Sequence, residues 1–202
     1  MIIPLKWSDI SWAWVVSHVL SPPIVWAALV CVIAFHAAES RGQALLWSAA
    51  YGLFVCLLPG LYILWLVRRG SVTDVHLQQR QQRPRVLLIS ALFAGLAWGA
   101  LRWLDAPPGL PLLAVITLAM LAITTLISLV WQISLHATSI SAAVIATGAY
   151  FGIVPALLVL PLALLVAAAR LNLKRHTPAE IIAGTLVGGL IPILLVAVGL
   201  AA

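Results

Sequence analysis

The chain has 202 residues and a formal net charge of +6, yet only 8% of its residues are charged and 64% are hydrophobic. Several apolar runs exceed the roughly 18–20 residues that a helix needs to cross a bilayer, which excludes an ordinary soluble domain. A transmembrane barrel would require alternating segments of about ten residues, and the sequence contains none. The composition therefore predicts an all-α, multi-pass membrane protein in which residues 1–202 form a single integral membrane domain.

Seven apolar segments are expected to be helices, and the first two contain prolines that predict kinks at Pro22–Pro23 and Pro59–Gly60. The segment 137–169 is too long for one span, because a helix of that length would measure about 50 Å whereas the hydrocarbon core is about 30 Å thick. Gly152 and Pro155 offer a break, so two short helices are predicted there. This polytopic helix bundle then has seven transmembrane helices, or six if 137–169 is a single helix. The expected helices are residues 11–37, 44–67, 86–104, 109–132, 138–152, 154–169 and 178–200.

The basic residues are distributed unevenly between the two faces of the predicted bundle. With seven spans, the N-terminus and the loops 68–85, 133–137 and 170–177 fall on one face. The positive-inside rule places this face in the cytoplasm, and a bacterial inner (plasma) membrane is the expected location. Because the charge is carried by short loops, it indicates orientation and contact with anionic membrane lipids, and no nucleic-acid partner is expected. The basic residues on this face are Lys6, Arg68, Arg69, Arg80, Arg83, Arg85, Arg170, Lys174 and Arg175, against Arg41 and Arg102 on the other.

Three polar clusters lie on this predicted face. In the first, Arg80 and Arg83 are three residues apart, so in a helical turn they would face the same way. In the second, Ser134 and His136 interrupt an otherwise uncharged region. Guanidinium groups, a hydroxyl and imidazoles that converge at a membrane surface suit a phosphate, because Arg binds phosphate oxygens bidentately. The clusters are HLQQRQQRP (76–84), WQISLHA (131–137) and ARLNLKRHTPAE (169–180).

The third cluster contains a predicted helix N-terminus, with Thr177 as the cap and Pro178 at the first helical position. His176 directly precedes this N-terminus, whose backbone N–H groups favour an anion. An imidazole can attack phosphorus if a carboxylate holds its far nitrogen, and Glu180 can supply that carboxylate. His136 could protonate the departing oxygen. Glu180 also completes a T-x-x-E capping box with Thr177, so a purely structural role for it stays open, and both roles can coexist.

These motifs resemble those of the type 2 phosphatidic acid phosphatase superfamily, membrane lipid phosphatases related to the vanadium haloperoxidases. The family pattern is K-x6-R-P, then P-S-G-H, then S-R-x5-H-x3-D. The resemblance covers about residues 74–185 and implies a haloperoxidase-like helical core. The matching residues are Arg83–Pro84 in the first motif, Ser134 and His136 in the second, and Arg170-x5-His176-x3 in the third.

The resemblance also implies roles for individual residues. His176 would be the nucleophile that forms a phosphohistidine, His136 the general acid, and Glu180 the group that orients His176. The residues that would hold phosphate oxygens are Arg83, Arg170 and Ser134.

The sequence departs from the family pattern at three positions. The family lysine falls on His76, its glycine on Leu135 and its last aspartate on Glu180. His76 carries charge only part of the time at neutral pH, so Arg80 is a candidate replacement for the lysine from the same loop.

Function classes remain open at this point. The leading expectation is an enzyme that hydrolyses a lipid phosphate or a polyprenyl diphosphate, without metal or cofactor, because the covalent histidine route needs none. The alternative is a catalytically silent relative that serves as a structural or lipid-binding subunit of a larger membrane complex, and a homo-oligomer is also compatible. A transporter or channel has less support, because the segment 106–169 contains no charged residue.

Overall fold

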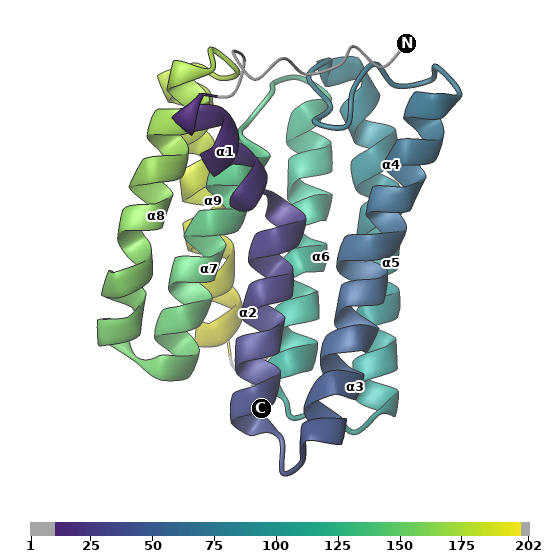
Figure 1. Cartoon of the computed structure of the whole chain (residues 1–202), viewed down its shortest axis with the longest axis vertical. Coiled ribbons are helices and arrows are strands. Elements are labelled where there is room, and N and C mark those ends of the chain that lie inside the picture. The colour runs from purple at the N-terminus through teal and green to yellow at the C-terminus, as the bar shows by residue number, and fades with distance from the viewer. Residues whose placement is uncertain (1–10, 199–202) are drawn as a thin grey trace.

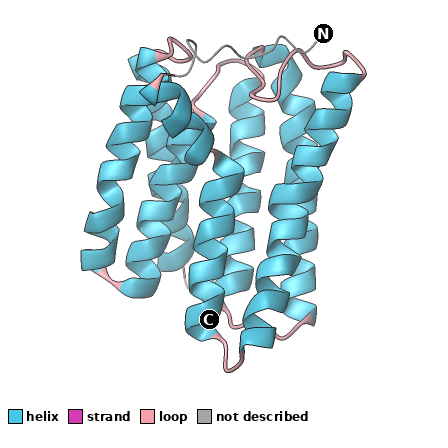
Figure 2. Cartoon of the chain, in the orientation of Figure 1, coloured by secondary structure: helices cyan, strands magenta, loops and turns pink. Residues whose placement is uncertain are grey.

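The computed structural model describes residues 11–198, and within this range the chain is helical with no strand (Figure 2). This confirms the predicted all-α fold. Lys6, the N-terminus and the last two residues of the helix expected at 178–200 lie outside the described residues. The elements are α1 (Trp12–Val19), α2 (Pro22–Ala37), α3 (Arg41–Tyr51), the π-helical η2 (Gly52–Leu57), α4 (Leu58–Arg68), the 3-10 turn η3 (Arg80–Gln82), α5 (Arg83–Trp103), α6 (Gly109–Ser128), α7 (Leu135–Phe151), α8 (Ile153–Asn172) and α9 (Pro178–Ala197).

The long helices run side by side, and the loops alternate between the two ends of the bundle (Figure 1). The loops from α4 to α5, α6 to α7 and α8 to α9 lie at one end together with α1, which is the upper end in Figure 1. Helix α5 packs mainly against α6, and α7 packs against both α8 and α9. The three loop regions that carry the predicted polar clusters therefore meet at one end of the molecule.

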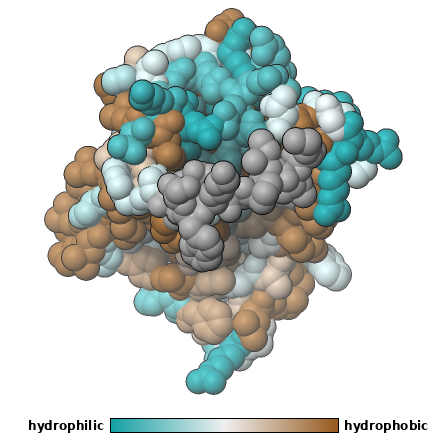
Figure 3. All heavy atoms as spheres, turned by 45° about the horizontal axis from the view of Figure 1, so that its top comes forward, coloured by the Kyte–Doolittle hydropathy of each residue, from teal (hydrophilic) through white to brown (hydrophobic). Residues whose placement is uncertain are grey.

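Within residues 11–198, five helices are long and apolar enough to cross a membrane, and a sixth span is possible if α1 and α2 together form one. The outer faces of these helices are apolar: Leu88, Leu92 and Leu96, spaced four apart on α5, are all exposed. In the space-filling view the polar surface gathers at the loop end, above apolar flanks (Figure 3). These features are compatible with a multi-pass membrane protein.

The structure supports five to six spans of sufficient length, whereas the sequence predicts six to seven. The difference is α7, which has 17 residues. At 1.5 Å per residue such a helix measures about 25 Å, less than the roughly 30 Å of a hydrocarbon core. Helix α7 still runs alongside α8 in the opposite direction, so the order of loops at the two ends follows the predicted pattern (Figure 1).

The first predicted helix, residues 11–37, is wrong as a single element. It consists of α1 and α2, which are bent by 49° relative to each other at Leu20–Ser21. Ser21 has an extended backbone with ψ 150° and precedes Pro22 at the start of α2. Proline lacks an N–H group and cannot continue the preceding helix, which explains why the chain breaks here instead of kinking gently.

The other two predicted irregularities have different forms. Before Pro59 the chain makes a π-helical segment, Gly52–Leu57, and no break, because a wider turn accommodates the missing N–H group of the proline. The segment 137–169 is divided at Gly152, as predicted, into α7 and α8. Gly152 has φ +89°, a left-handed conformation that glycine adopts without the steric cost of a Cβ atom.

Helices α7 and α9 approach closely through two glycines on α9. A Cβ atom at Gly184 would lie 2.6 Å from the Ser134 carbonyl oxygen, and one at Gly188 would overlap the carbonyl of Thr138. The N–H group of Ser134 also donates to the Glu180 carbonyl at 3.1 Å. This contact places the start of α7, with His136, beside the start of α9, with His176.

Candidate functional site

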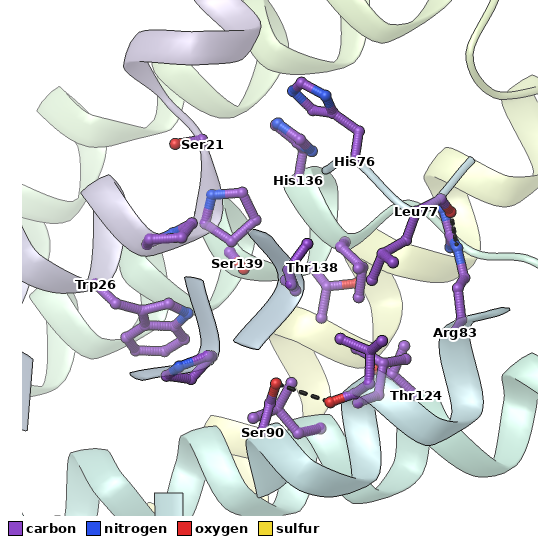
Figure 4. A pocket seen from close by; sticks show the side chains of 18 of the residues that line it. Ser21, Trp26, His76, Leu77, Arg83, Ser90, Thr124, His136, Thr138 and Ser139 are labelled. Atoms are coloured by element: carbon purple, nitrogen blue, oxygen red, sulfur yellow. Dashed lines mark hydrogen bonds between the residues drawn. The ribbon is translucent and has the colours of Figure 1, made fainter. Parts of the chain in front are cut away.

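A cavity of about 370 Å³ lies between α2, α4, α5, α6 and α7 and reaches the loop end of the bundle. Deeper in the bundle its lining is mostly apolar. Trp26, Ser90 and Thr124 mark this inner part, away from the imidazoles of His76 and His136 (Figure 4). Six basic side chains from different parts of the sequence form its polar end. They are His18, His76, Arg83, His136, Arg170 and His176.

A second cavity of about 120 Å³ adjoins the first at its polar end. The two cavities share four lining residues, His76, Arg83, Arg170 and His176. The smaller cavity adds polar side chains from the three loops, namely Gln78, Gln132, Lys174 and Arg175. The four shared side chains therefore stand between an outer polar space and an inner, largely apolar one.

Five of the eight predicted site residues line this cavity: His76, Arg83, His136, Arg170 and His176. The other three, Glu180, Ser134 and Arg80, lie beside it and contact other groups, as described below.

Ser134 and Arg80 line neither cavity. Ser134 is the N-cap of α7: its hydroxyl accepts from the Ala137 N–H at 3.4 Å, and its side chain is fully buried. Arg80 donates to the carbonyls of Ser128 and Leu129 at the end of α6, where a cation satisfies free helix carbonyls. The structure therefore assigns both side chains contacts at helix ends instead of the predicted place at the anion site.

Arg83 is 2% exposed and connects two loops. Its Nε donates to the Leu77 carbonyl and its Nη1 to the Ile133 carbonyl, each at 2.8 Å. Figure 4 shows the first of these bonds at the edge of the cavity. Both Arg80 and Arg83 thus reach the α6–α7 connection, in agreement with their spacing, but only Arg83 lines the cavity.

Arg170 is 5% exposed, and its guanidinium makes few hydrogen bonds. Its Nε is buried without a hydrogen-bond partner, and its Nη1 donates to the Ser17 hydroxyl at 3.5 Å. A buried donor left unsatisfied costs about 1–3 kcal/mol, and more when it is charged. Within residues 11–198 the only ion pair is that of His176 with Glu180, so Arg170 has no carboxylate partner there. The Arg170 side chain also lines the cavity, so an anion bound there would compensate its charge.

His176 is held by Glu180. The Nδ1 atom of His176 lies 3.1 Å from Oε2 of Glu180, and the same oxygen accepts from the Thr177 N–H at 2.9 Å. The Glu180 N–H donates in turn to the Thr177 hydroxyl at 3.3 Å. The carboxylate therefore completes the capping box and orients the imidazole at once, so the two alternatives of the sequence analysis coexist. Because an ionised carboxylate only accepts, Nδ1 carries the proton and Nε2 keeps its lone pair.

The environment of His176 favours the neutral imidazole. Burial lowers the pKa of His176, and the Arg170 charge lowers it further, although the hydrogen bond to Glu180 opposes both effects. A neutral imidazole with a free Nε2 lone pair can act as a nucleophile.

Two further imidazoles lie beside His136. The ring centroids of His76 and His136 are 6.3 Å apart, and those of His18 and His76 are 5.0 Å apart. His18 is stacked on Trp14 at 3.8 Å and donates from Nδ1 to the Trp14 carbonyl. Burial and the neighbouring His18 and Arg170 lower the pKa of His76.

His18 was not among the predicted site residues. The signal available in the sequence was an ionisable residue within an apolar span, which is uncommon and often functional. Its contact with the site depends on the bend between α1 and α2, which the sequence suggests but does not position.

The arrangement is suited to anion binding and to proton transfer. Two buried guanidinium groups, a carboxylate-oriented imidazole and a second buried imidazole share one cavity. Within residues 11–198, no group of three or more His, Cys, Asp or Glu residues is arranged to hold a metal ion.

What the fold and the cavity define is an all-helical protein, with five to six apolar helices long enough to span a membrane and a basic cavity at one end of the bundle. Comparison of the chain with models of protein families, with curated proteins and with solved structures finds no match.

Proposed function

We propose that this protein is a membrane phosphohydrolase that removes phosphate from a lipid phosphate or a polyprenyl diphosphate through a phosphohistidine on His176. The observation that carries this proposal is the cavity that His176, His136 and Arg170 line together, where the buried guanidinium of Arg170 has no carboxylate partner within residues 11–198. A phosphate group there would accept from Arg170 and bring its phosphorus within reach of the imidazole.

The proposed reaction has two steps. In the first, Nε2 of His176 attacks phosphorus, a P–N bond forms, and the P–O bond to the leaving group breaks. His136, which takes up a proton on Nδ1 when the phosphate binds, gives this proton to the leaving oxygen. In the second, water attacks the phosphohistidine, gives a proton to His136, and the P–N bond breaks to release inorganic phosphate. Glu180 stabilises the positive charge that develops on His176, because its carboxylate contacts Nδ1.

The form of the cavity supports an amphiphilic substrate. Its polar end is at the loop end of the bundle, and its other lining residues are mostly apolar, among them Trp26, Leu87 and Met120. A phosphate bound at the polar end would leave room for an attached hydrocarbon chain among these side chains. We place this end of the bundle on the cytoplasmic face, because most Lys and Arg residues lie there. A reporter fused to the N-terminus that gives an exterior signal would overturn this orientation.

Phosphate release by the purified protein tests the proposal. Polyprenyl diphosphates and phosphatidate in detergent micelles are the substrates, and acid-labile labelling of the protein reports the phosphohistidine. We expect wild type to release phosphate and His176→Ala to lose both release and labelling. His36→Ala is the matched control, because His36 contacts Phe151 near the other end of the bundle. Equal phosphate release by wild type and His176→Ala would exclude the covalent route.

One alternative is a catalytically silent subunit that binds a lipid phosphate. One contact favours it: the Ser134 hydroxyl, which the family motif would use to hold a phosphate oxygen, caps α7 and is engaged within the protein. Binding of lipid phosphates without turnover across the same panel would support this reading and reject the enzymatic one.

A further inference from the structure

Helix α1 lies outside the segments that carry the three polar motifs, yet its last turn reaches two of the site residues. The Ser17 carbonyl accepts from Nε2 of His136 at 3.0 Å, and the Ser17 hydroxyl accepts from Nη1 of Arg170 at 3.5 Å. Ser17 is 1% exposed. One residue of α1 therefore contacts the start of α7 and the end of α8 at the same time.

The Ser17 carbonyl is available because the first span is broken. In a continuous α-helix it would accept from the N–H group of Ser21, four residues later. Here the Ser21 N–H donates to the His18 carbonyl at 3.3 Å, and the chain turns by 49° before Pro22 starts α2. The last carbonyls of a helix have no partner within it and must find one elsewhere. The imidazole of His136 is that partner.

This bond fixes the tautomer of His136. A carbonyl oxygen can only accept, so Nε2 of His136 carries a proton. In the neutral ring Nδ1 is then the basic nitrogen, and it alone is free to take and give a proton. The Ser17 carbonyl therefore sets both the tautomer and the ring orientation of His136.

The hydroxyl of Ser17 has a different effect, on Arg170. The guanidinium has no carboxylate partner within residues 11–198, and its Nε is unpaired. The contact with Ser17 restrains Nη1 and leaves Nε without a partner. A restrained guanidinium loses less conformational freedom when it binds an anion, which strengthens binding.

We propose that Ser17 is a positioning residue, whose carbonyl orients His136 for proton transfer and whose hydroxyl orients Arg170 for anion binding. The role in proton transfer rests on the proposed function. The effects of both contacts, on the tautomer of His136 and on the affinity for an anion, can be measured without turnover. Helix α1 thus completes the site from outside the motif region, through the break that Pro22 and Pro23 impose on the first span.

The first measurement is the tautomer of His136 in wild-type protein labelled with ¹⁵N-histidine, in detergent near pH 7.5. Long-range ¹H–¹⁵N spectra distinguish the two neutral forms, and the His136→Gln spectrum assigns the signal. We expect the Nε2–H form for His136. The Nδ1–H form, or an even mixture of both, would overturn the role of the carbonyl.

The second measurement is the affinity for vanadate, an inorganic phosphate analogue, in wild type, Ser17→Ala and Val15→Ala. Val15 lies on the same helix and is exposed, so it controls for a general loosening of α1. We expect Ser17→Ala to weaken vanadate binding about three- to tenfold, the effect of losing one hydrogen bond, while Val15→Ala binds as wild type. Equal affinity of wild type and Ser17→Ala would overturn the role of the hydroxyl.

Kinetics separate this inference from the proposed function. With an active protein, Ser17→Ala should raise KM by a similar factor and leave kcat within about twofold, because the carbonyl to His136 is retained. A protein that releases no phosphate but gives the expected tautomer and vanadate affinities would refute the enzymatic proposal and keep Ser17 as a positioning residue for anion binding. A fall in melting temperature with unchanged affinity and KM would show that Ser17 only packs.

Discussion

Nδ1 of His176 lies 3.1 Å from Oε2 of Glu180, which follows it by four residues across the start of α9. The same carboxylate oxygen accepts from the Thr177 N–H at the start of α9. A capping interaction and the orientation of a potential nucleophile are therefore combined in one side chain. Substitutions at Glu180 can separate the two effects, because an amide can cap a helix but carries no charge.

Glu180→Gln is expected to keep the helix cap and lose most of the activity. Glutamine also serves in a capping box, so stability should change little. The charge that stabilises a positive His176 would be absent, and we expect kcat to fall by up to about 10⁴-fold, as in a Ser-His-Asp triad whose aspartate is replaced by asparagine. Glu180→Ala should also lose the hydrogen bond that the carboxylate accepts from the Thr177 N–H, at a cost of about 0.5–1.5 kcal/mol. Phosphate release and thermal melting of the two variants check this, and a Glu180→Gln variant as active as wild type would contradict it.

The buried imidazoles predict how stability changes with pH. Burial and Arg170 lower the pKa of His176, and burial and His18 lower the pKa of His76. The unfolded chain, in which a histidine has a pKa of about 6.5, therefore binds more protons than the folded protein at mildly acidic pH. The stabilising effect of the neutral rings is present above about pH 6.5 and is lost as the pH falls towards the folded-state pKa.

Melting temperatures between pH 8 and pH 5 measure this effect in wild type, His76→Ala and Leu92→Ala. We expect wild type to lose stability on acidification and His76→Ala to lose less, because one of the shifted groups is gone. Leu92 is exposed on the outer side of α5, so its variant should follow wild type. Parallel curves for wild type and His76→Ala would show that His76 titrates normally in the folded protein.

Replacing each of the two buried arginines by methionine is expected to change the stability of the protein in opposite directions. Arg83 donates to the carbonyls of Leu77 and Ile133, whereas Nε of Arg170 has no partner. Arg83→Met should therefore destabilise the protein by about 2–4 kcal/mol, since it leaves two carbonyls unsatisfied. Arg170→Met removes an incompletely paired buried charge, and its stability should equal or exceed that of wild type.

Anion binding completes this comparison. Arg170→Met should abolish measurable vanadate binding while it melts at or above the wild-type temperature, which separates a functional arginine from a structural one. Thermal melting with and without vanadate provides both values, because a ligand raises the melting temperature only of a protein that binds it. Marked destabilisation by Arg170→Met would show that Arg170 mainly supports the fold.

Much of the fold is predictable from local sequence, and the exceptions have local causes. Gly152 divides α7 from α8 because its left-handed backbone ends the first helix, and the sequence indicates this directly. The second span begins at Arg41 instead of residue 44, because Ser40 and Gln43 form a capping box that its apolar pattern does not reveal. The first span breaks instead of kinking because Ser21 has an extended backbone and Pro22, which lacks an N–H group, starts a new helix after it.

The site is only partly predictable, since spacing identifies side chains but not their contacts. His176 directly precedes the N-cap Thr177, and Glu180 is the third residue of α9, so their contact follows from the capping box, in which the Glu180 side chain reaches back past the helix start. The hydroxyl of Ser134 is a group that can bind a phosphate oxygen, yet its position directly before α7 makes it the N-cap of that helix. Ser17 contributes a backbone carbonyl, a group that every residue has, and only the tertiary contact with His136 distinguishes it.

The depth of the cavity predicts a dependence on chain length. Ser90 lines its inner part, well away from His76 and His136 (Figure 4). Ser90→Phe should fill this space and lower kcat/KM for long-chain lipid phosphates at least about tenfold, because a chain that binds there would be displaced. A short, water-soluble phosphate ester does not reach Ser90 and should be hydrolysed as by wild type. Leu92→Phe adds an aromatic ring to the exposed side of the same helix and serves as the control. Equal losses for long and short substrates in Ser90→Phe would mean that the cavity does not hold the hydrocarbon chain.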